Sequence, residues 1–119
     1  MKPKLVRNRI PQIIKEAGKK CKWYYSDTYL FAPGSNLGKF LYDKMQEELD
    51  EFMEDPCVEE AADMFEVFSA IIETYGAVHQ AEEGGYTPFS YQDVLDCAKN
   101  KREERGSFDV GIILEEVYE

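Results

Sequence analysis

The sequence predicts an all-α protein, and three observations lead to that fold class. Apolar residues recur at helical spacing over two long segments, residues 37–54 and 56–75. Between them stands Asp55-Pro56, which we interpret as an N-cap followed by proline at the first helical position. The length of 119 residues suffices for one domain with a core but is short for two. We therefore expect a single domain over residues 1–119, built as an antiparallel helical bundle.

The segment before the long helices is less regular. Pro11 suits the first turn of a short helix that stops near Gly18. Residues 20–30 are rich in β-forming aromatic residues and allow a short strand or hairpin. A turn at residues 32–36 then precedes the first long helix.

The segment after the long helices predicts one further helix. Residues 77–90 carry turn signals and no helical periodicity. Ser90 with Asp93 predicts the start of a helix over residues 91–104. The apolar tail from Phe108 to Val117 is expected to pack or to pair with another chain.

Two groups of acidic residues lie inside the long helical patterns. They are Glu47-Glu48-x-x-Glu51 and Glu60-x-x-Asp63. Spacings of three and four residues place each group on one helix face. Because a very short turn joins the two helices, they should be antiparallel neighbours with the two groups facing each other. The sequence thus predicts a four-carboxylate site made of Glu48, Glu51, Glu60 and Asp63.

Helical phase indicates that several of these acids are buried. Glu48 falls inside the apolar arc of its helix, which is made of Leu37, Leu41, Met45, Leu49 and Phe52. Glu60 and Asp63 lie off the one clear solvent stripe of their helix, which is made of Glu59, Glu66 and Glu73. No lysine or arginine lies between Lys44 and Lys99, so we expect no local salt-bridge partner.

Clustered carboxylates need a positive charge between them. Two of them about 4 Å apart repel by roughly 4 kcal/mol at an effective dielectric constant near 20. A hard divalent cation removes this repulsion, which favours Mg²⁺ with Mn²⁺ as the alternative ion. The competing interpretation is a solvated acidic face without a metal.

Charge and composition restrict the function classes. The net charge of −10 argues against a binder of nucleic acid polymers. No signal peptide or membrane span is evident, and we expect a cytoplasmic protein with reduced thiols at Cys21, Cys57 and Cys97, mostly as core filler. Of the fourteen basic residues, eight lie in residues 1–22 and four in residues 99–105. This distribution suits a metal site flanked by anion-binding groups, or alternatively basic ends that dock onto the acidic centre.

Through its two acidic groups, the chain resembles the all-α nucleotide pyrophosphohydrolases, which include the MazG-like and phosphoribosyl-ATP pyrophosphohydrolase-like proteins. The acidic groups match the family pattern E-E-x-x-E followed by E-x-x-D. The segment K-L-V-R-N-R-I-P at residues 4–11 resembles the K-L-V-R-D-K-I-P start of a small branch, with Asn8 in place of aspartate. The segment K-R-E-E-R-G-S-F at residues 101–108 resembles that branch's K-x-E-E-R-G-G-F ending.

The resemblance implies Mg²⁺-dependent hydrolysis of a nucleoside triphosphate between the α and β phosphates, as in nucleotide-pool house-cleaning. It implies metal ligation by Glu48, Glu51, Glu60 and Asp63, and for Glu47 a role in orienting or deprotonating water or in binding a second metal. Phosphate contacts are expected from Lys101, Arg102, Arg105, Lys4 and Arg7. A homodimer or homotetramer is expected to complete the bundle. The alternatives are phosphoribosyl-ATP pyrophosphohydrolase and a non-catalytic helical module that binds a metal.

Overall fold

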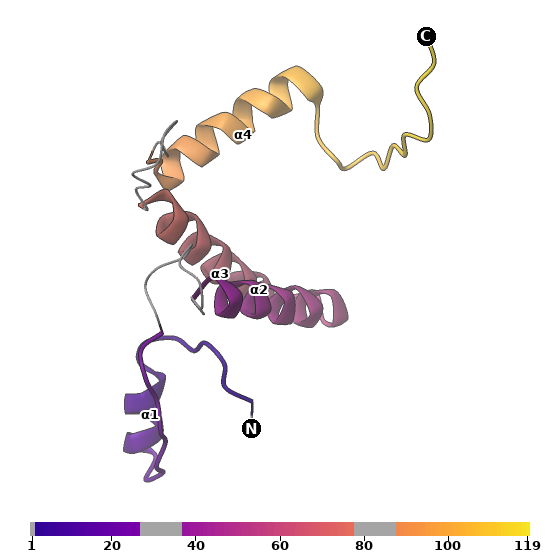
Figure 1. Cartoon of the computed structure of the whole chain (residues 1–119). Coiled ribbons are helices and arrows are strands. Elements are labelled where there is room, and N and C mark those ends of the chain that lie inside the picture. The colour runs from indigo at the N-terminus through magenta and orange to yellow at the C-terminus, as the bar shows by residue number, and fades with distance from the viewer. Residues whose placement is uncertain (1, 27–36, 78–87) are drawn as a thin grey trace. The chain divides into compact units, whose positions relative to one another are not determined.

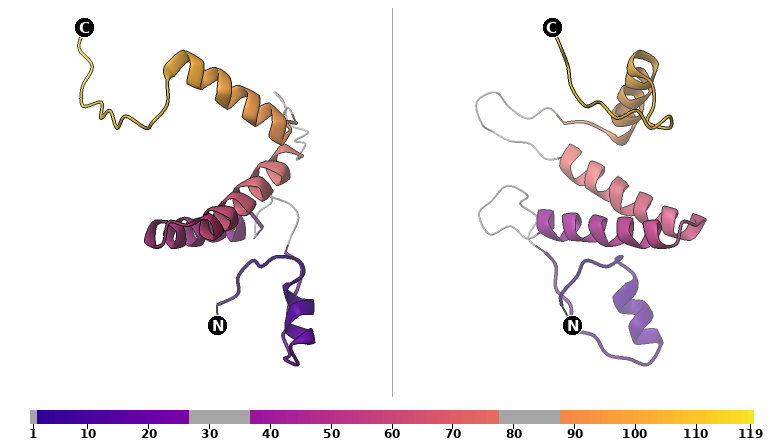
Figure 2. Two further views of the ribbon diagram at one scale, coloured as in Figure 1. Left: turned by 180° about the vertical axis from the view of Figure 1, so that it is seen from behind. Right: turned by 90° about the vertical axis from the view of Figure 1, so that its right-hand side faces the viewer.

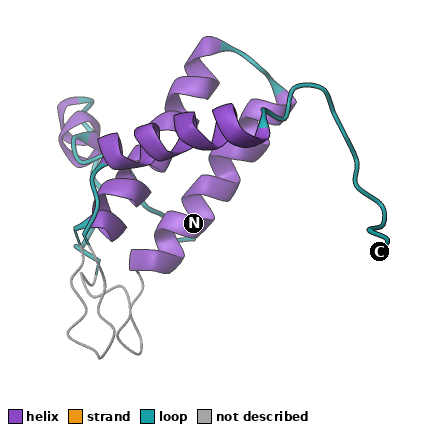
Figure 3. Cartoon of the chain, turned by 90° about the horizontal axis from the view of Figure 1, so that it is seen from above, coloured by secondary structure: helices purple, strands orange, loops and turns teal. Residues whose placement is uncertain are grey.

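The computed structural model of the chain describes residues 2–26, 37–77 and 88–119. Within these ranges the protein is all-α, as predicted, and contains no strand (Figures 1 and 3). The chain divides into two compact units, Met1–Tyr75 and Gly76–Glu119, which are described separately. The single domain expected over residues 1–119 stays a prediction.

The N-terminal helix α1 spans Ile10–Glu16, with Pro11 in its first turn as predicted. The Ala17 N–H donates to the Ile13 carbonyl, and Gly18 follows with φ of 77°, a left-handed conformation that ends the helix. The strand allowed for residues 20–30 does not form in residues 20–26, and residues 27–30 lie outside the described ranges. A strand needs a hydrogen-bonded partner strand, and aromatic composition alone does not supply one.

Two long helices form an antiparallel hairpin (Figure 2). Helix α2 spans Leu37–Glu54, the predicted range, and helix α3 spans Val58–Gly76. The prediction that Asp55 caps α3 is wrong, because α3 begins two residues later than expected. The Asp55 N–H instead donates to the Glu51 carbonyl at 3.0 Å and so ends α2. The predicted turn is present, but it is longer by those two residues.

Burial on the hairpin is uneven. Leu41 and Glu48 are the buried residues of α2, with 4% and 6% of their surface exposed. The predicted solvent stripe of α3 is confirmed, since Glu59, Glu66 and Glu73 are all exposed. Apolar side chains outside this small buried centre, such as those of Leu49 and Phe68, remain substantially exposed. Two helices alone leave the outer part of each apolar face uncovered.

The second unit contains helix α4, which spans Tyr91–Arg105. A capping box starts it as predicted: the Asp93 N–H donates to Ser90 Oγ at 3.1 Å, and the Ser90 N–H donates to Asp93 Oδ2 at 2.8 Å. These hydrogen bonds hold the pKa of the Asp93 carboxyl below its ordinary value. The tail from Phe108 to Val117 is exposed and irregular, so it does not pack within the described part of the chain.

The three cysteines are free and exposed, so the expectation that they fill the core is wrong. Cys57 lies in the turn before α3, Cys21 in the irregular segment after α1, and Cys97 on the exposed helix α4. These parts of the chain are exposed, so the cysteine side chains are exposed although they are hydrophobic. Among the described residues, no helix is long and apolar enough to span a membrane.

Candidate metal centre

Three carboxylates from the two helices of the hairpin converge at one place. Glu48 of α2 and Glu60 and Asp63 of α3 each offer an oxygen, and these oxygens lie within 4.8 Å of one another. The structure thus brings together three of the four residues for which we predicted metal ligation. We call this set the acidic cluster.

The fourth predicted ligand, Glu51, lies at the rim of the acidic cluster. Its side chain is exposed, and it does not belong to the group of three. The negative charge of Glu48 raises the pKa of the Glu51 carboxyl above its ordinary value, with smaller contributions from desolvation and from the charges of Glu60 and Glu47. Glu51 lies one helical turn from Glu48, and metal ligation by Glu51 stays a prediction.

Two oxygens of the acidic cluster are buried without a hydrogen-bond partner in the described structure. They are Oε2 of Glu48 and Oε2 of Glu60. A buried polar atom without a partner costs about 1–3 kcal/mol, and more when it is charged. Carboxylate oxygens alone make up the donor set, which is the chemistry that Mg²⁺ and Mn²⁺ prefer. The residues present therefore fit a hard divalent cation.

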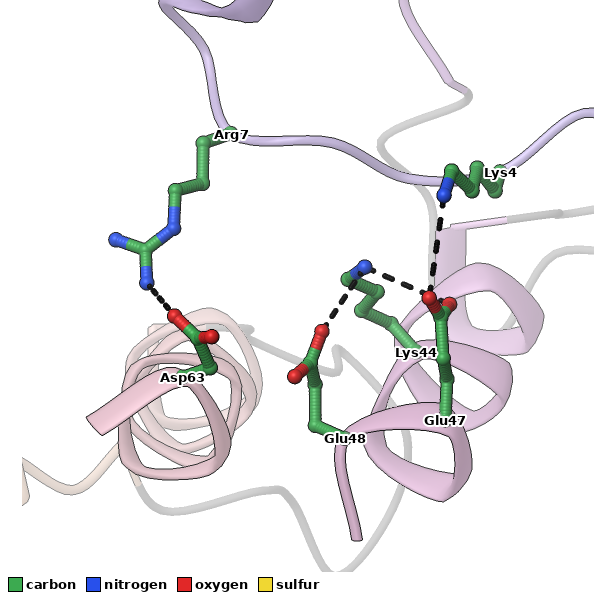
Figure 4. Close-up of polar contacts among 6 residues, drawn as sticks. All are labelled: Lys4, Arg7, Lys44, Glu47, Glu48 and Asp63. Carbon is green, nitrogen blue, oxygen red and sulfur yellow. Dashed lines mark hydrogen bonds and ion pairs between the residues drawn. The ribbon is translucent and has the colours of Figure 1, made fainter. Parts of the chain in front are cut away.

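Two basic side chains pair with members of the acidic cluster, and a third pairs with the neighbouring Glu47 (Figure 4). Arg7 Nη2 donates to Asp63 Oδ1 at 2.8 Å, and Lys4 Nζ lies 3.9 Å from Glu47 Oε1. Lys44 Nζ lies 3.0 Å from Glu48 Oε1 and 3.5 Å from Glu47 Oε2. The expectation that these acids lack a local salt-bridge partner is therefore wrong for Glu48, whereas the partner of Asp63, Arg7, lies 56 residues away in the chain.

Lys44 is held firmly between its two carboxylate partners. Its side chain is only 18% exposed. Burial lowers the pKa of Lys44, but the hydrogen bond to Glu48 and the charges of Glu47 and Glu48 outweigh it, so that the pKa lies above its ordinary value. The ammonium group is therefore a permanent positive charge at neutral pH.

The residues predicted to contact phosphates fall into two sets. Lys4 and Arg7 lie beside the acidic cluster, where each pairs with a carboxylate. Lys101, Arg102 and Arg105 lie exposed near the end of α4 in the second unit. A phosphate contact from either set stays a prediction.

A hollow of about 360 Å³ lies between the N-terminal segment and α2, and no residue of the acidic cluster lines it. One wall is the N-terminal segment, residues 2–5, and the other is one face of α2, formed by Phe40, Asp43, Lys44 and Glu47. Lys44 lines the hollow and connects it to the acidic cluster, because it pairs both with Glu47 of the lining and with Glu48 of the cluster. We did not predict a role for Phe40 or Asp43, although their spacings of seven and four residues from Glu47 place them on its face of α2.

Comparisons of the chain with protein-family models, with curated proteins and with solved structures find no match. The function must therefore be argued from the geometry of the acidic cluster and from the sequence motifs.

Proposed function

We propose that this protein is a Mg²⁺-dependent nucleoside triphosphate pyrophosphohydrolase. It would cleave between the α and β phosphates and release a nucleoside monophosphate and pyrophosphate, in cytoplasmic nucleotide-pool house-cleaning. The observation that carries the proposal is the pair of buried, unpartnered oxygens, Glu48 Oε2 and Glu60 Oε2, in the acidic cluster. The order of the three sequence motifs supports the same reaction class.

The carboxylates in and around the acidic cluster have two different roles in this proposal. Glu48, Glu60 and Asp63 would hold the ion, with Glu51 joining from the rim. When bound, Mg²⁺ would neutralise phosphate charge and acidify a coordinated water. Glu47 lies outside the group of three, on the side of the hollow, and is the proposed residue for orienting or deprotonating the attacking water.

The hollow supplies a place for the rest of the substrate. Phe40 lies eight positions before Glu48 in α2, which corresponds to a rise of about 12 Å along the helix. With its phosphates at the acidic cluster, the substrate would reach Phe40, whose ring offers a surface for stacking a base. Lys4 and Arg7, which pair with Glu47 and Asp63, are the proposed phosphate contacts of this unit.

The proposal is tested with a panel of deoxy- and ribonucleoside triphosphates and phosphoribosyl-ATP. Pyrophosphate and orthophosphate are measured separately, with Mg²⁺ and with a chelator. We expect pyrophosphate and a monophosphate in the presence of Mg²⁺ only. Orthophosphate as the product would contradict cleavage between the α and β phosphates. Metal binding without release from any substrate would identify a non-catalytic helical module instead.

We also propose that the chain forms a homodimer or homotetramer. Leu49, Met53 and Phe68 on the hairpin are 40%, 69% and 42% exposed, and a second copy of the hairpin would cover such side chains. We expect Phe68→Glu to lower the mass measured by analytical ultracentrifugation to that of one chain. Glu73→Gln, on the solvent stripe, should leave the oligomer intact. A monomeric wild-type protein would rule out this part of the proposal.

A further inference from the structure

Lys44 lies beside the acidic cluster, between the carboxylates of Glu47 and Glu48. In two-metal hydrolases the ions lie roughly 3.5–4 Å apart. Lys44 Nζ lies within 3.5 Å of Glu47 Oε2 and 3.0 Å of Glu48 Oε1, so the ammonium bridges two carboxylates as a metal ion would. Because its side chain is mostly buried, Lys44 is fixed in this position.

The two oxygens of Glu48 have different surroundings. Oε1 accepts the hydrogen bond from Lys44, whereas Oε2 is buried and has no partner among the described residues. The residue as a whole is 6% exposed, so solvent does not satisfy the second oxygen. Glu60, whose Oε2 is also unpartnered, and Asp63 complete the group on α3. Both unpartnered oxygens thus belong to residues of the acidic cluster.

The formal charges in and around the acidic cluster also indicate one bound divalent ion. Five carboxylates take part, those of Glu47, Glu48, Glu51, Glu60 and Asp63. Three basic side chains pair with them, those of Lys4, Arg7 and Lys44. Two negative charges remain, which one divalent cation balances. A second divalent ion would leave two positive charges in excess.

We propose that the centre binds one divalent cation per chain, at Glu48, Glu60 and Asp63, and that Lys44 is a built-in cation in place of a second ion. Lys44 is thus a positioning residue that sets the metal stoichiometry. This inference rests on the metal centre of the proposed function, but it does not depend on the reaction that the centre catalyses.

The experiment counts bound Mn²⁺ by electron paramagnetic resonance on the full chain. The wild type should bind one ion per chain, with the spectrum of an isolated Mn²⁺. Lys44→Met should bind two, with the spin coupling of neighbouring ions. Lys44→Arg keeps the charge and should bind one. Lys39→Met, which removes an exposed lysine of the same helix, is the matched control and should also bind one.

The outcomes separate this inference from the proposed function. Two ions in the wild type, or one ion in a folded Lys44→Met variant, would overturn the role of Lys44. If Lys44→Met does not fold, Lys44→Gln takes its place, and the wild-type count still decides on one ion against two. The absence of pyrophosphate release from a chain that binds one ion would contradict only the enzymatic proposal.

Discussion

Replacing Glu48 with glutamine is expected to abolish pyrophosphate release and to weaken Mg²⁺ binding while the helices stay folded. The amide removes the negative charge from the most buried member of the acidic cluster. Outer-shell substitutions at metal sites already cost about 10–100-fold in affinity or activity, so loss of a ligand should exceed about 100-fold. The rate is measured with the best substrate of the panel, and Mg²⁺ affinity by calorimetry.

Glu66→Gln is the matched control for this variant. Glu66 lies on the exposed solvent stripe of α3, so the same change in charge should leave rate and affinity unaltered. Far-UV circular dichroism of both variants checks that the helices persist. A Glu48→Gln protein with wild-type turnover would disprove the assignment of the centre.

Glu60→Gln is expected to raise the unfolding temperature in the absence of divalent ions. Glu60 lies in the acidic cluster with a buried, unpartnered oxygen, and among the described residues it makes no ion pair. The amide relieves repulsion and stabilises the folded state by about 1 kcal/mol. This corresponds to a shift of about 4 °C. The melting temperature is measured by circular dichroism in a chelator.

With saturating Mg²⁺ the order should reverse, because the wild type gains the free energy of ion binding and the variant loses a ligand. Glu59→Gln is the control, since Glu59 is exposed beside Glu60 in the sequence and should change neither temperature. If the Glu60→Gln protein melts below the wild type in a chelator, repulsion between Glu60 and its neighbouring carboxylates does not destabilise the wild type.

Local sequence patterns predicted the hairpin well. The spacing of apolar residues gave the range of α2 to the residue, and the phase of Glu48 within the apolar arc predicted its burial. Both depend on the geometry of a single helix, which sequence determines directly. The start of α3 was missed because Asp55-Pro56 suits a turn as well as it suits a cap.

The surroundings of the acidic cluster could not be predicted in the same way. Arg7 and Asp63 are 56 residues apart in the chain, and no spacing rule connects an irregular segment with a helix. The Lys44–Glu48 pair has a separation of four residues and was open to prediction, whereas the lack of lysine and arginine between Lys44 and Lys99 suggested that Glu48 has no partner. The exposure of Cys57 and Phe68 depends on which other elements pack against the hairpin. The sequence pattern of a single helix does not determine that packing.

The ion pairs of the centre differ in how they respond to dissolved salt. The side chains of Arg7 and Asp63 are 58% and 44% exposed, whereas the side chains of Lys44 and Glu48 are 18% and 8% exposed. Added electrolyte screens exposed charges, with a Debye length of about 8 Å at physiological ionic strength and about 3 Å at 1 M, and acts far less on buried ones. Raising the ionic strength should therefore weaken the Arg7–Asp63 ion pair, which joins the N-terminal segment to α3. The Lys44–Glu48 ion pair within α2 should stay intact. A titration with potassium chloride can thus separate the two cationic partners of the centre without any change to the sequence.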